Sequence, residues 1–338
     1  IDGCEPTTTT TTVAPSWTQL GADDALIGMA ALNDSHDVVY LQLTGSDMLR
    51  ATLDQGADHW GSVRVGGSGD GGTSDWVRTM DMQFTSGGNP AIMYTSNNDP
   101  GTGDYTISYR VLTGEDMMDQ SHWSLVRILT ENPGTAGYQS AESTGFSLAM
   151  NPVNDKPGLA YCSTGRTSAG KTDLMYLSLT GTDPNDPAHW GNHEVIVYGI
   201  ERSVGPWDTD DGVDSYCSLA YGSGGEPYIA YEDLGHVLGY AHMAWLSGSD
   251  VSSFWDWGTV RVNTSSNTGQ YNSIGVSPLT NKPMIATGGL DSTDYALLFH
   301  SFDGALDDYN DWTVTILDKP TSNFTLNGFL RHVVHISR

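Results

Sequence analysis

Between Ser218 and Val262 the chain reads SLAYGSGGEPYIAY, then LGYAHMAW and GTVRV, in which small, apolar and aromatic residues alternate. Nothing in this stretch has the i, i+3, i+4 apolar spacing of an amphipathic helix. The first piece predicts a hairpin that turns at Gly224-Gly225. LGYAHMAW and Gly258–Val262 predict a third and a fourth strand. The stretch therefore predicts one four-stranded antiparallel sheet.

The last strand of this predicted sheet recurs along the chain. The WGTVRV segment has counterparts of similar pattern, and the tryptophans that open all six copies are Trp17, Trp60, Trp123, Trp190, Trp257 and Trp312. Neighbouring tryptophans are 43 to 67 residues apart, and the same hairpin pattern precedes most of them. A four-stranded unit repeated at this period predicts a β-propeller, and six last strands predict six blades. The predicted strands of the first blade are Leu26–Ala31, Val38–Leu43, Met48–Leu53 and Ser62–Val65.

The loops that precede five of the tryptophans share polar residues. Each loop contains an aspartate, and a histidine stands directly before the tryptophan in three blades, at His59, His122 and His189. We expect the aspartates to accept hydrogen bonds from turn amides and the indoles to pack at the blade edge. Three histidines at equivalent positions far apart on a ring cannot form one metal site, so they are predicted to be structural.

Both ends of the chain depart from the repeat. Residues 1–16 include six consecutive threonines, and Trp17–Gly21 matches a last strand although no blade precedes it. The spacing after Trp312 makes Gly328–Ser337 the first strand of a sixth blade. The predicted fold is all-β, a six-bladed propeller of four-stranded antiparallel blades, its last blade incomplete and closed with the N-terminal strand. The predicted division is a threonine-rich extension at 1–16 and a propeller at 17–338.

A β-branched extension is suited to pair with the edge of an incomplete blade. The main hypothesis is β-strand addition to the next molecule, as in the donor strands of pilins, which builds a head-to-tail homopolymer. Folding back onto its own blade is the alternative. The candidate donor residues are Thr7, Thr8, Thr9, Thr10, Thr11, Thr12 and Val13. The candidate acceptor residues are Phe329, Leu330, Val333, Val334, Ile336, Trp17 and Leu20. This hypothesis predicts a non-enzymatic structural subunit of an extracellular or cell-surface filament.

The net charge of the chain indicates which classes of partner are not expected. Acidic residues outnumber basic ones 41 to 14, for a formal net charge of −27. Nucleic acids and anionic membranes attract basic surfaces, so neither is an expected partner. The sequence also has no apolar run of 18 or more residues, the length that a membrane-spanning helix needs.

One acidic loop is a candidate cation site. The segment WDTDDGVD places four carboxylates around Gly212, at Asp208, Asp210, Asp211 and Asp214. Oxygen ligands at alternate positions beside a glycine are typical of Ca²⁺ loops. A solvated acidic loop is the alternative, and no other cofactor is predicted.

The three cysteines are Cys4, Cys162 and Cys217. Cys162 ends a second strand and Cys217 begins the first strand of the next blade, so both are expected on the same face of neighbouring blades. They are candidates for a disulfide, and two buried thiols are the alternative. Cys4 in the extension is left for an intermolecular bond or a free thiol.

The segment SGDGGTSDW, from Ser68 to Trp76, resembles the Asp-box of sialidase-like propellers, Ser-x-Asp-x-Gly-x-Thr-Trp. It falls between two predicted blades, whereas the family places the box between third and fourth strands. The resemblance therefore extends to the repeat architecture. It implies a sialidase-like glycoside hydrolase as an alternative function, but that family needs three arginines that meet at the substrate carboxylate. Arg64, Arg127 and Arg261 recur in outer strands, where they cannot converge at the central channel.

A further alternative is an adhesive propeller that binds glycans or proteins. Its candidate contacts are the loop tryptophans Trp76, Trp207 and Trp255, whose indoles can stack on sugar rings. Packing of the same indoles between blades is the competing interpretation.

Overall fold

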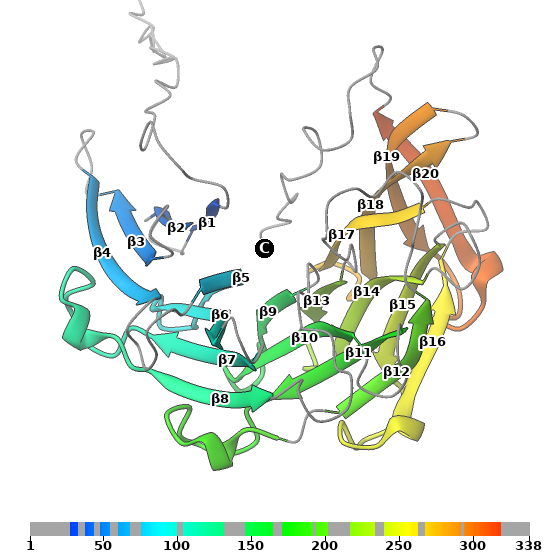
Figure 1. The fold of residues 1–338 in the computed structure, drawn as a ribbon. Coiled ribbons are helices and arrows are strands. Elements are labelled where there is room, and N and C mark those ends of the chain that lie inside the picture. Colours follow the sequence, from blue (N-terminus) through cyan, green and yellow to red (C-terminus); the bar gives the residue numbers. More distant parts are fainter. Residues whose placement is uncertain are drawn as a thin grey trace, which may run out of the picture.

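The structure is a computed structural model (Figure 1), and it describes part of the chain. The described ranges are 28–32, 38–43, 48–54, 60–67, 76–99, 104–131, 146–164, 171–191, 194–201, 217–233, 240–262, 268–291 and 294–318. Within them the secondary structure is β-strands and single turns of 3-10 helix. No helix in these ranges has the length and apolar character needed to cross a membrane.

The strands form five antiparallel sheets of four within the described ranges, and strands that are neighbours in sequence are neighbours in space. We call the sheets blades 1 to 5. Blade 1 contains β1 Gly28–Leu32, β2 Val38–Leu43, β3 Met48–Asp54 and β4 Trp60–Gly67. Blade 2 contains β5 Trp76–Phe84, β6 Pro90–Asp99, β7 Asp104–Val111 and β8 Val126–Glu131. Blade 3 contains β9 Phe146–Met150, β10 Pro157–Thr164, β11 Lys171–Ser178 and β12 Glu194–Glu201. Blade 4 contains β13 Cys217–Tyr221, β14 Pro227–Asp233, β15 Tyr240–Leu246 and β16 Trp257–Arg261. Blade 5 contains β17 Thr268–Val276, β18 Pro283–Asp291, β19 Asp294–Phe302 and β20 Trp312–Asp318.

The propeller prediction is confirmed. Figure 1 shows the sheets fanned around one axis, with the first strand of each blade near the axis and the fourth strand outside. The predicted strand Val38–Leu43 coincides with β2, and the predicted strand Met48–Leu53 is one residue shorter than β3. The predicted sixth blade, Gly328–Ser337 with Trp17–Gly21, lies outside the described residues.

Each blade has two distinct ends. One end carries the hairpin turn from first to second strand and the loop from third to fourth strand, and we call it the turn end. At the other end the chain passes from the fourth strand of one blade to the first strand of the next, and we call it the crossover end.

The hairpin turns of blades 2 to 5 share one backbone device. Each turn contains a residue with positive φ: Gly88 (78°), Asp155 (55°), Gly225 (88°) and Asn281 (53°). Glycine adopts this left-handed conformation without strain, and asparagine and aspartate tolerate it best among the other residues. The predicted turn at Gly224-Gly225 is confirmed, since β13 ends at Tyr221 and β14 begins at Pro227.

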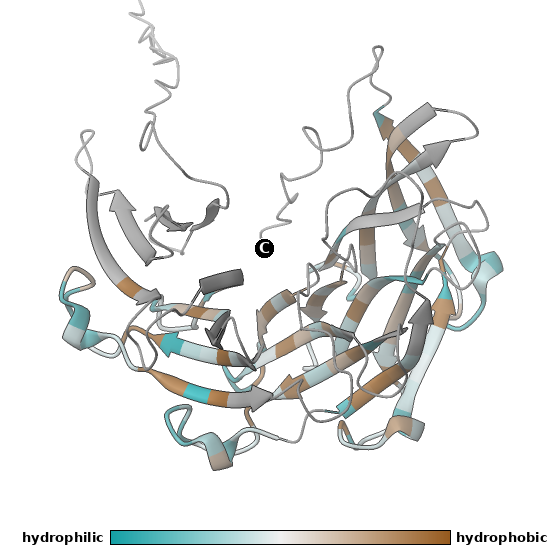
Figure 2. Cartoon of the chain, viewed as in Figure 1, coloured by the Kyte–Doolittle hydropathy of each residue, from teal (hydrophilic) through white to brown (hydrophobic). Residues whose placement is uncertain are grey.

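The core consists of apolar layers between neighbouring blades. One layer joins blades 2 and 3 and includes Met93, Tyr109, Leu159 and Trp190. Similar layers join blade 3 to blade 4 and blade 4 to blade 5. Figure 2 shows hydrophobic segments along the strands and hydrophilic residues in the loops of the turn end. Each inner blade is covered on both faces by its neighbours. Successive side chains along its strands, which point to opposite faces, are therefore both buried.

The repeated tryptophans close the third-to-fourth-strand loops. In blades 2 to 5 a 3-10 turn directly precedes the tryptophan: η1 Gln120–His122, η3 Pro187–His189, η4 Phe254–Asp256 and η5 Tyr309–Asp311. Each indole is buried and its Nε1–H donates to the carbonyl six residues earlier, at 2.9 to 3.4 Å. Asp119, Asp186 and Asp308 accept hydrogen bonds from turn amides two residues later. The structural role predicted for these loops is confirmed.

In these loops the side chain of the residue directly before the tryptophan packs against a glycine near the start of the same loop. A Cβ atom on Gly181 would overlap His189, and one on Gly248 would overlap Asp256. His189 Nδ1 lies 3.1 Å from the Asp183 amide nitrogen, whereas Asp256 Oδ2 accepts from the amide of Asp250 at 2.9 Å. Histidine in blade 3 and aspartate in blade 4 therefore supply the same kind of acceptor. His189 is structural, as predicted; His59 lies outside the described residues.

Candidate functional site

A series of polar side chains ties the first strands of neighbouring blades together near the axis. In each case a side-chain oxygen accepts a hydrogen bond from a backbone N–H of the next blade. The bonds are Leu148 N–H to Asp81 Oδ2 (2.7 Å), Leu219 N–H to Ser147 Oγ (3.0 Å) and Ile274 N–H to Ser218 Oγ (3.2 Å). Ser273 occupies the same register position on β17. Serine is therefore sufficient for this contact in blades 3 and 4.

Asp81 departs from that pattern in blade 2. Its side chain is buried, and Oδ1 accepts a second hydrogen bond from the N–H of Met82 at 2.7 Å. Burial raises the pKa of Asp81 to about 7, although the amides of Leu148 and Met82 favour the ionised form. With both oxygens held by backbone amides, this carboxyl joins blades 2 and 3 and is not free to meet a substrate.

Replacing Asp81 with serine, the residue of the other blades, is expected to change the pH dependence of stability. An unfolded aspartate loses its proton near pH 3.8, whereas Asp81 keeps it to about pH 7 in the fold. Its protonation therefore contributes stability that is complete below pH 3.8 and lost as the pH rises to about 7. The melting temperature of Asp81→Ser minus that of wild type should rise from pH 5 to pH 8. Ser218→Ala provides the control, whose difference should not change with pH.

Glu232 breaks the repeat at a second position near the axis. The strand registers make Thr95, Cys162, Glu232 and Gly288 equivalent residues of second strands. All four are buried, and Glu232 is 4 % exposed. Ala230 packs in the layer between blades 4 and 5, and residues two apart on a strand share a face. Glu232 therefore places its side chain at the interface with blade 5.

The partner position across this interface holds an amide side chain. Asn272 directly precedes Ser273 on β17, just as Cys217 directly precedes Ser218 on β13. Glu232 and Asn272 therefore take, between blades 4 and 5, the positions that Cys162 and Cys217 take between blades 3 and 4. Both are buried. A carboxylate at an interface that threonine, cysteine or glycine fills elsewhere costs desolvation energy, and such groups are concentrated at functional sites.

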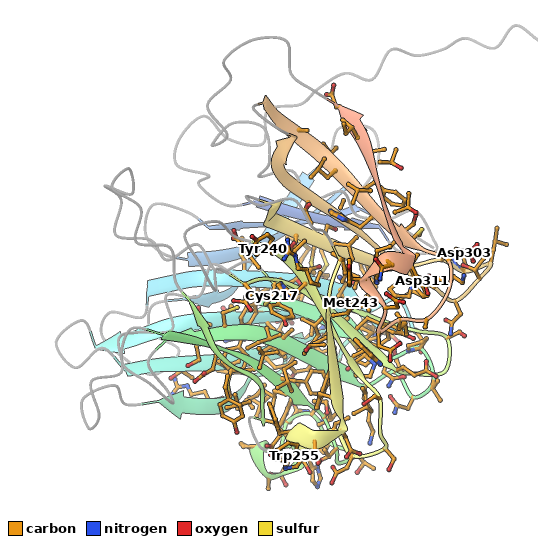
Figure 3. The ribbon with its side chains drawn as sticks, turned by 90° about the vertical axis from the view of Figure 1, so that its right-hand side faces the viewer. Cys217, Tyr240, Met243, Trp255, Asp303 and Asp311 are labelled. Carbon is orange, nitrogen blue, oxygen red and sulfur yellow. The ribbon has the colours of Figure 1, made fainter. Side chains whose placement is uncertain are left out.

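The opposite face of β14 presents a polar and aromatic group to blade 3. Tyr231 stacks on His242, with ring centroids 5.4 Å apart. The Arg261 guanidinium carbon lies 3.5 Å from the centre of the Tyr240 ring, in a cation–π contact. Burial lowers the pKa of His242, and the nearby Asp233 carboxylate opposes this shift. These residues lie at the crossover end of blade 4, where Figure 3 shows Tyr240.

Cys162 and Cys217 are brought together as the sequence predicted, but as two thiols. Both are buried in the layer between blades 3 and 4 and both are free. Burial raises the pKa of Cys217, and the adjacent Cys162 raises it further. The alternative of two buried thiols is therefore the one that the structure contains.

Most of the other predicted site residues lie outside the described part of the chain. The candidate donor residues 7–13, the acceptor residues, Cys4 and the acidic loop Asp208–Asp214 lie outside the described residues. Among the residues that are described, no three His, Cys, Asp or Glu side chains are grouped to hold a metal ion. Of the candidate tryptophans, Trp76 is the first residue of β5. Trp255 is 87 % exposed, so its indole does not pack between blades.

The arginines behave as the sequence indicated. Arg127 is exposed on β8 and Arg261 lies on β16, the outermost strands of blades 2 and 4. Arg110 is buried on β7, where its Nε–H donates to the Tyr94 hydroxyl at 3.4 Å. These three guanidinium groups, on separate strands of two blades, do not form an arginine cluster.

Comparison with known proteins gives the fold a clear counterpart. No protein-family model and no curated protein sequence matches the chain. An α-L-arabinofuranosidase from Fusarium graminearum, solved with an iminosugar inhibitor, superposes with a TM-score of 0.52 at 10 % identity, covering 86 % of this chain and 80 % of the enzyme. A protein of unknown function from Dyadobacter fermentans has a TM-score of 0.50 at 10 % identity, over 87 % and 83 % of the two chains. A mutant NanB sialidase from Streptococcus pneumoniae has a TM-score of 0.49 at 8 % identity, over 85 % and 60 %.

The comparisons confirm one sequence prediction and overturn another. The predicted resemblance to sialidase-like propellers in repeat architecture is confirmed by the four-stranded blades and by the shared fold of the α-L-arabinofuranosidase. The prediction of a non-enzymatic structural subunit of a filament is wrong, because the fold is that of solved glycoside hydrolases, and this favours the enzyme alternative.

Proposed function

We propose that this protein is a glycoside hydrolase whose substrate binds at the crossover end of the propeller, near Glu232. The observation that carries the proposal is Glu232 itself, a buried carboxyl at an interface where three other blades have uncharged residues. Burial of a carboxyl group costs desolvation energy, and hydrolysis of a glycosidic bond depends on carboxyl groups held in such controlled surroundings. The fold shared with an α-L-arabinofuranosidase supports the same class of chemistry.

Glu232 is the proposed proton donor. In this role its carboxyl gives a proton to the glycosidic oxygen, the bond from that oxygen to the anomeric carbon breaks, and water adds to the anomeric carbon. Such a reaction needs a second carboxylate. The segment 202–216 joins β12 to β13 and contains Asp208, Asp210, Asp211 and Asp214, which are the candidates for that role or for binding Ca²⁺.

The proposed substrate is a neutral sugar. A net charge of −27 repels anionic substrates such as sialosides, and a sialoside carboxylate requires grouped arginines. Arg110, Arg127 and Arg261, three arginines whose side chains the structure describes, lie on separate strands of blades 2 and 4. Neutral furanosides and pyranosides need hydroxyl, amide and carboxyl partners instead, and the amide of Asn272 is an example at the same end of the ring.

The ring is proposed to contain six blades. Five are described, and the spacing of the repeat assigns Gly328–Ser337 and Trp17–Gly21 to the sixth, so that the two ends of the chain close the propeller. An extracellular location, with glycans as partners, follows from a role in polysaccharide breakdown.

The test is hydrolysis by the purified full chain. The panel consists of 4-nitrophenyl α-L-arabinofuranoside, other neutral 4-nitrophenyl glycosides, arabinan, arabinoxylan and a fluorogenic sialoside. We expect release of product from a neutral glycoside with a kcat on the order of 1 to 10³ s⁻¹. Absence of hydrolysis across the neutral substrates would refute the proposal, and hydrolysis of the sialoside alone would refute the assigned substrate class.

A further inference from the structure

We infer that the turn end carries an accessory polysaccharide-binding surface, separate from the region of Glu232. It consists of Tyr198 on β12 and of Phe254 and Trp255 on η4. We call these three residues the aromatic platform. The inference rests on the proposed function for its ligand, a neutral polysaccharide chain, and it assigns a second place where that chain is held.

The three rings form a continuous group across two blades. The rings of Tyr198 and Phe254 have centroids 4.8 Å apart at 55°, and those of Phe254 and Trp255 are 5.3 Å apart at 80°. Tyr198 is 54 % exposed and Trp255 is 87 % exposed, whereas Phe254 is partly buried between them. Phe254 thus supports two rings that face solvent.

Comparison among the blades shows that the loop does not need this indole. The residues equivalent to Trp255, two before each repeated tryptophan, are Ser121, Ala188 and Asn310. All four loops form the same 3-10 turn, with a cap in extended conformation and an indole bonded to the carbonyl six residues earlier. Serine, alanine or asparagine is therefore sufficient for folding, and the tryptophan at 255 leaves a large apolar side chain in water.

An exposed indole of this kind is suited to a sugar ring. The C–H groups on one face of a furanose or pyranose pack on an aromatic face, while the hydroxyls remain available for hydrogen bonds. The loop beside Trp255 supplies hydroxyl and carboxyl groups, at Ser252, Ser253 and Asp250. Its carboxylates oppose an anionic ligand. Three side chains are also too small a surface for a stable contact between two copies of the chain, which needs about 800 Å² on each partner.

The two binding regions lie at different ends of blade 4. Figure 3 shows Trp255 at the outer margin of the molecule, far along the blade from Tyr240 and Cys217. A polymer held at the platform remains near the ring after each cleavage, which raises its effective concentration at the crossover end. A small glycoside occupies one site and gains nothing from the other. Loss of the platform should therefore weaken polymer binding and leave hydrolysis of small substrates unchanged.

The experiment is native affinity electrophoresis of the full chain in gels that contain arabinan or arabinoxylan. The test variant is Trp255→Ser, which installs the residue of blade 2, and the matched control is Tyr309→Ser, an exposed aromatic in the equivalent loop of blade 5. We expect wild type and Tyr309→Ser to be retarded by at least one polysaccharide. Trp255→Ser should bind about tenfold or more weakly. Its rate on a small chromogenic glycoside should equal that of wild type.

Equal retardation of wild type and Trp255→Ser would overturn the inference, as would absence of retardation by either polysaccharide. Retardation that depends on Trp255 without hydrolysis of any glycoside would support the platform and refute the proposed enzyme. The experiment thus distinguishes failure of the aromatic platform from failure of the proposed glycoside hydrolase activity.

Discussion

Replacing Glu232 with glutamine is expected to lower kcat on a neutral glycoside by about 10² to 10⁴-fold, the usual contribution of a general acid or base. The variant keeps the shape of the side chain but cannot donate the proton proposed to reach the glycosidic oxygen. Glu232 is buried between blades 4 and 5, where glutamine fills the same space with a group that cannot ionise. The melting temperature should therefore equal or exceed that of wild type, the behaviour of a residue retained for function at the expense of stability.

The adjacent carboxyl gives the control. Asp233 follows Glu232 on β14 and lies on the opposite face of the strand, toward blade 3. Asp233→Asn should keep kcat within a few-fold of wild type. Initial rates on 4-nitrophenyl glycosides and thermal melts of both variants make the comparison. A folded Glu232→Gln protein with the wild-type rate would remove Glu232 from the reaction.

Much of the fold could be predicted from the sequence because its signals are local. A run of β-branched, aromatic and apolar residues favours a strand at Val38–Leu43, and turn residues favour the hairpin between β13 and β14. The repeated tryptophans marked the start of the fourth strands, as at β16 and β20. Each of these features depends on a few consecutive residues and recurs in several blades.

The site was harder to predict because it depends on contacts between blades. In the sequence, PYIAYED has the pattern of an ordinary strand that ends in two acidic residues, Glu232 and Asp233. The burial of Glu232 follows from the packing of β14 against β17, which begins at Thr268. That packing has no local signature. The equivalence with Thr95 and Cys162 appears once strand registers are known.

The segment FWDW, residues 254–257, also shows that local sequence does not reveal which side chains are buried. Trp255 and Trp257 stand two positions apart, and composition does not distinguish them. The structure buries Trp257 and leaves Trp255 in solvent. Aligning the loops on their repeated tryptophans does distinguish the two residues. Trp257 then matches Trp190, whereas Trp255 has no aromatic counterpart in the other loops. In a repeat protein, a residue that recurs in every blade usually serves the fold. A residue found in one blade only, and unfavourable for stability there, is therefore a better indication of function.

Trp190→Ala is expected to destabilise the fold by about 3 to 5 kcal/mol, the usual cost of removing a buried tryptophan. Trp190 is 6 % exposed, its Nε1–H donates to the Pro184 carbonyl at 3.0 Å, and its ring meets Tyr109 of blade 2 with centroids 5.2 Å apart. The substitution therefore opens a cavity in the layer that holds blades 2 and 3 together, and it leaves the loop of η3 without its hydrogen bond. Guanidinium unfolding followed by far-UV circular dichroism measures the effect.

Trp255→Ala is the matched comparison, since it removes the same side chain from the equivalent kind of loop. An exposed residue contributes within about 0.5 kcal/mol, so its unfolding midpoint should stay at the wild-type value. If both variants unfold at the same lower denaturant concentration, Trp255 is part of the folded core and the aromatic platform loses its basis. If only Trp190→Ala shifts, the two tryptophan positions have separate roles: one closes the blade and the other is available to a ligand.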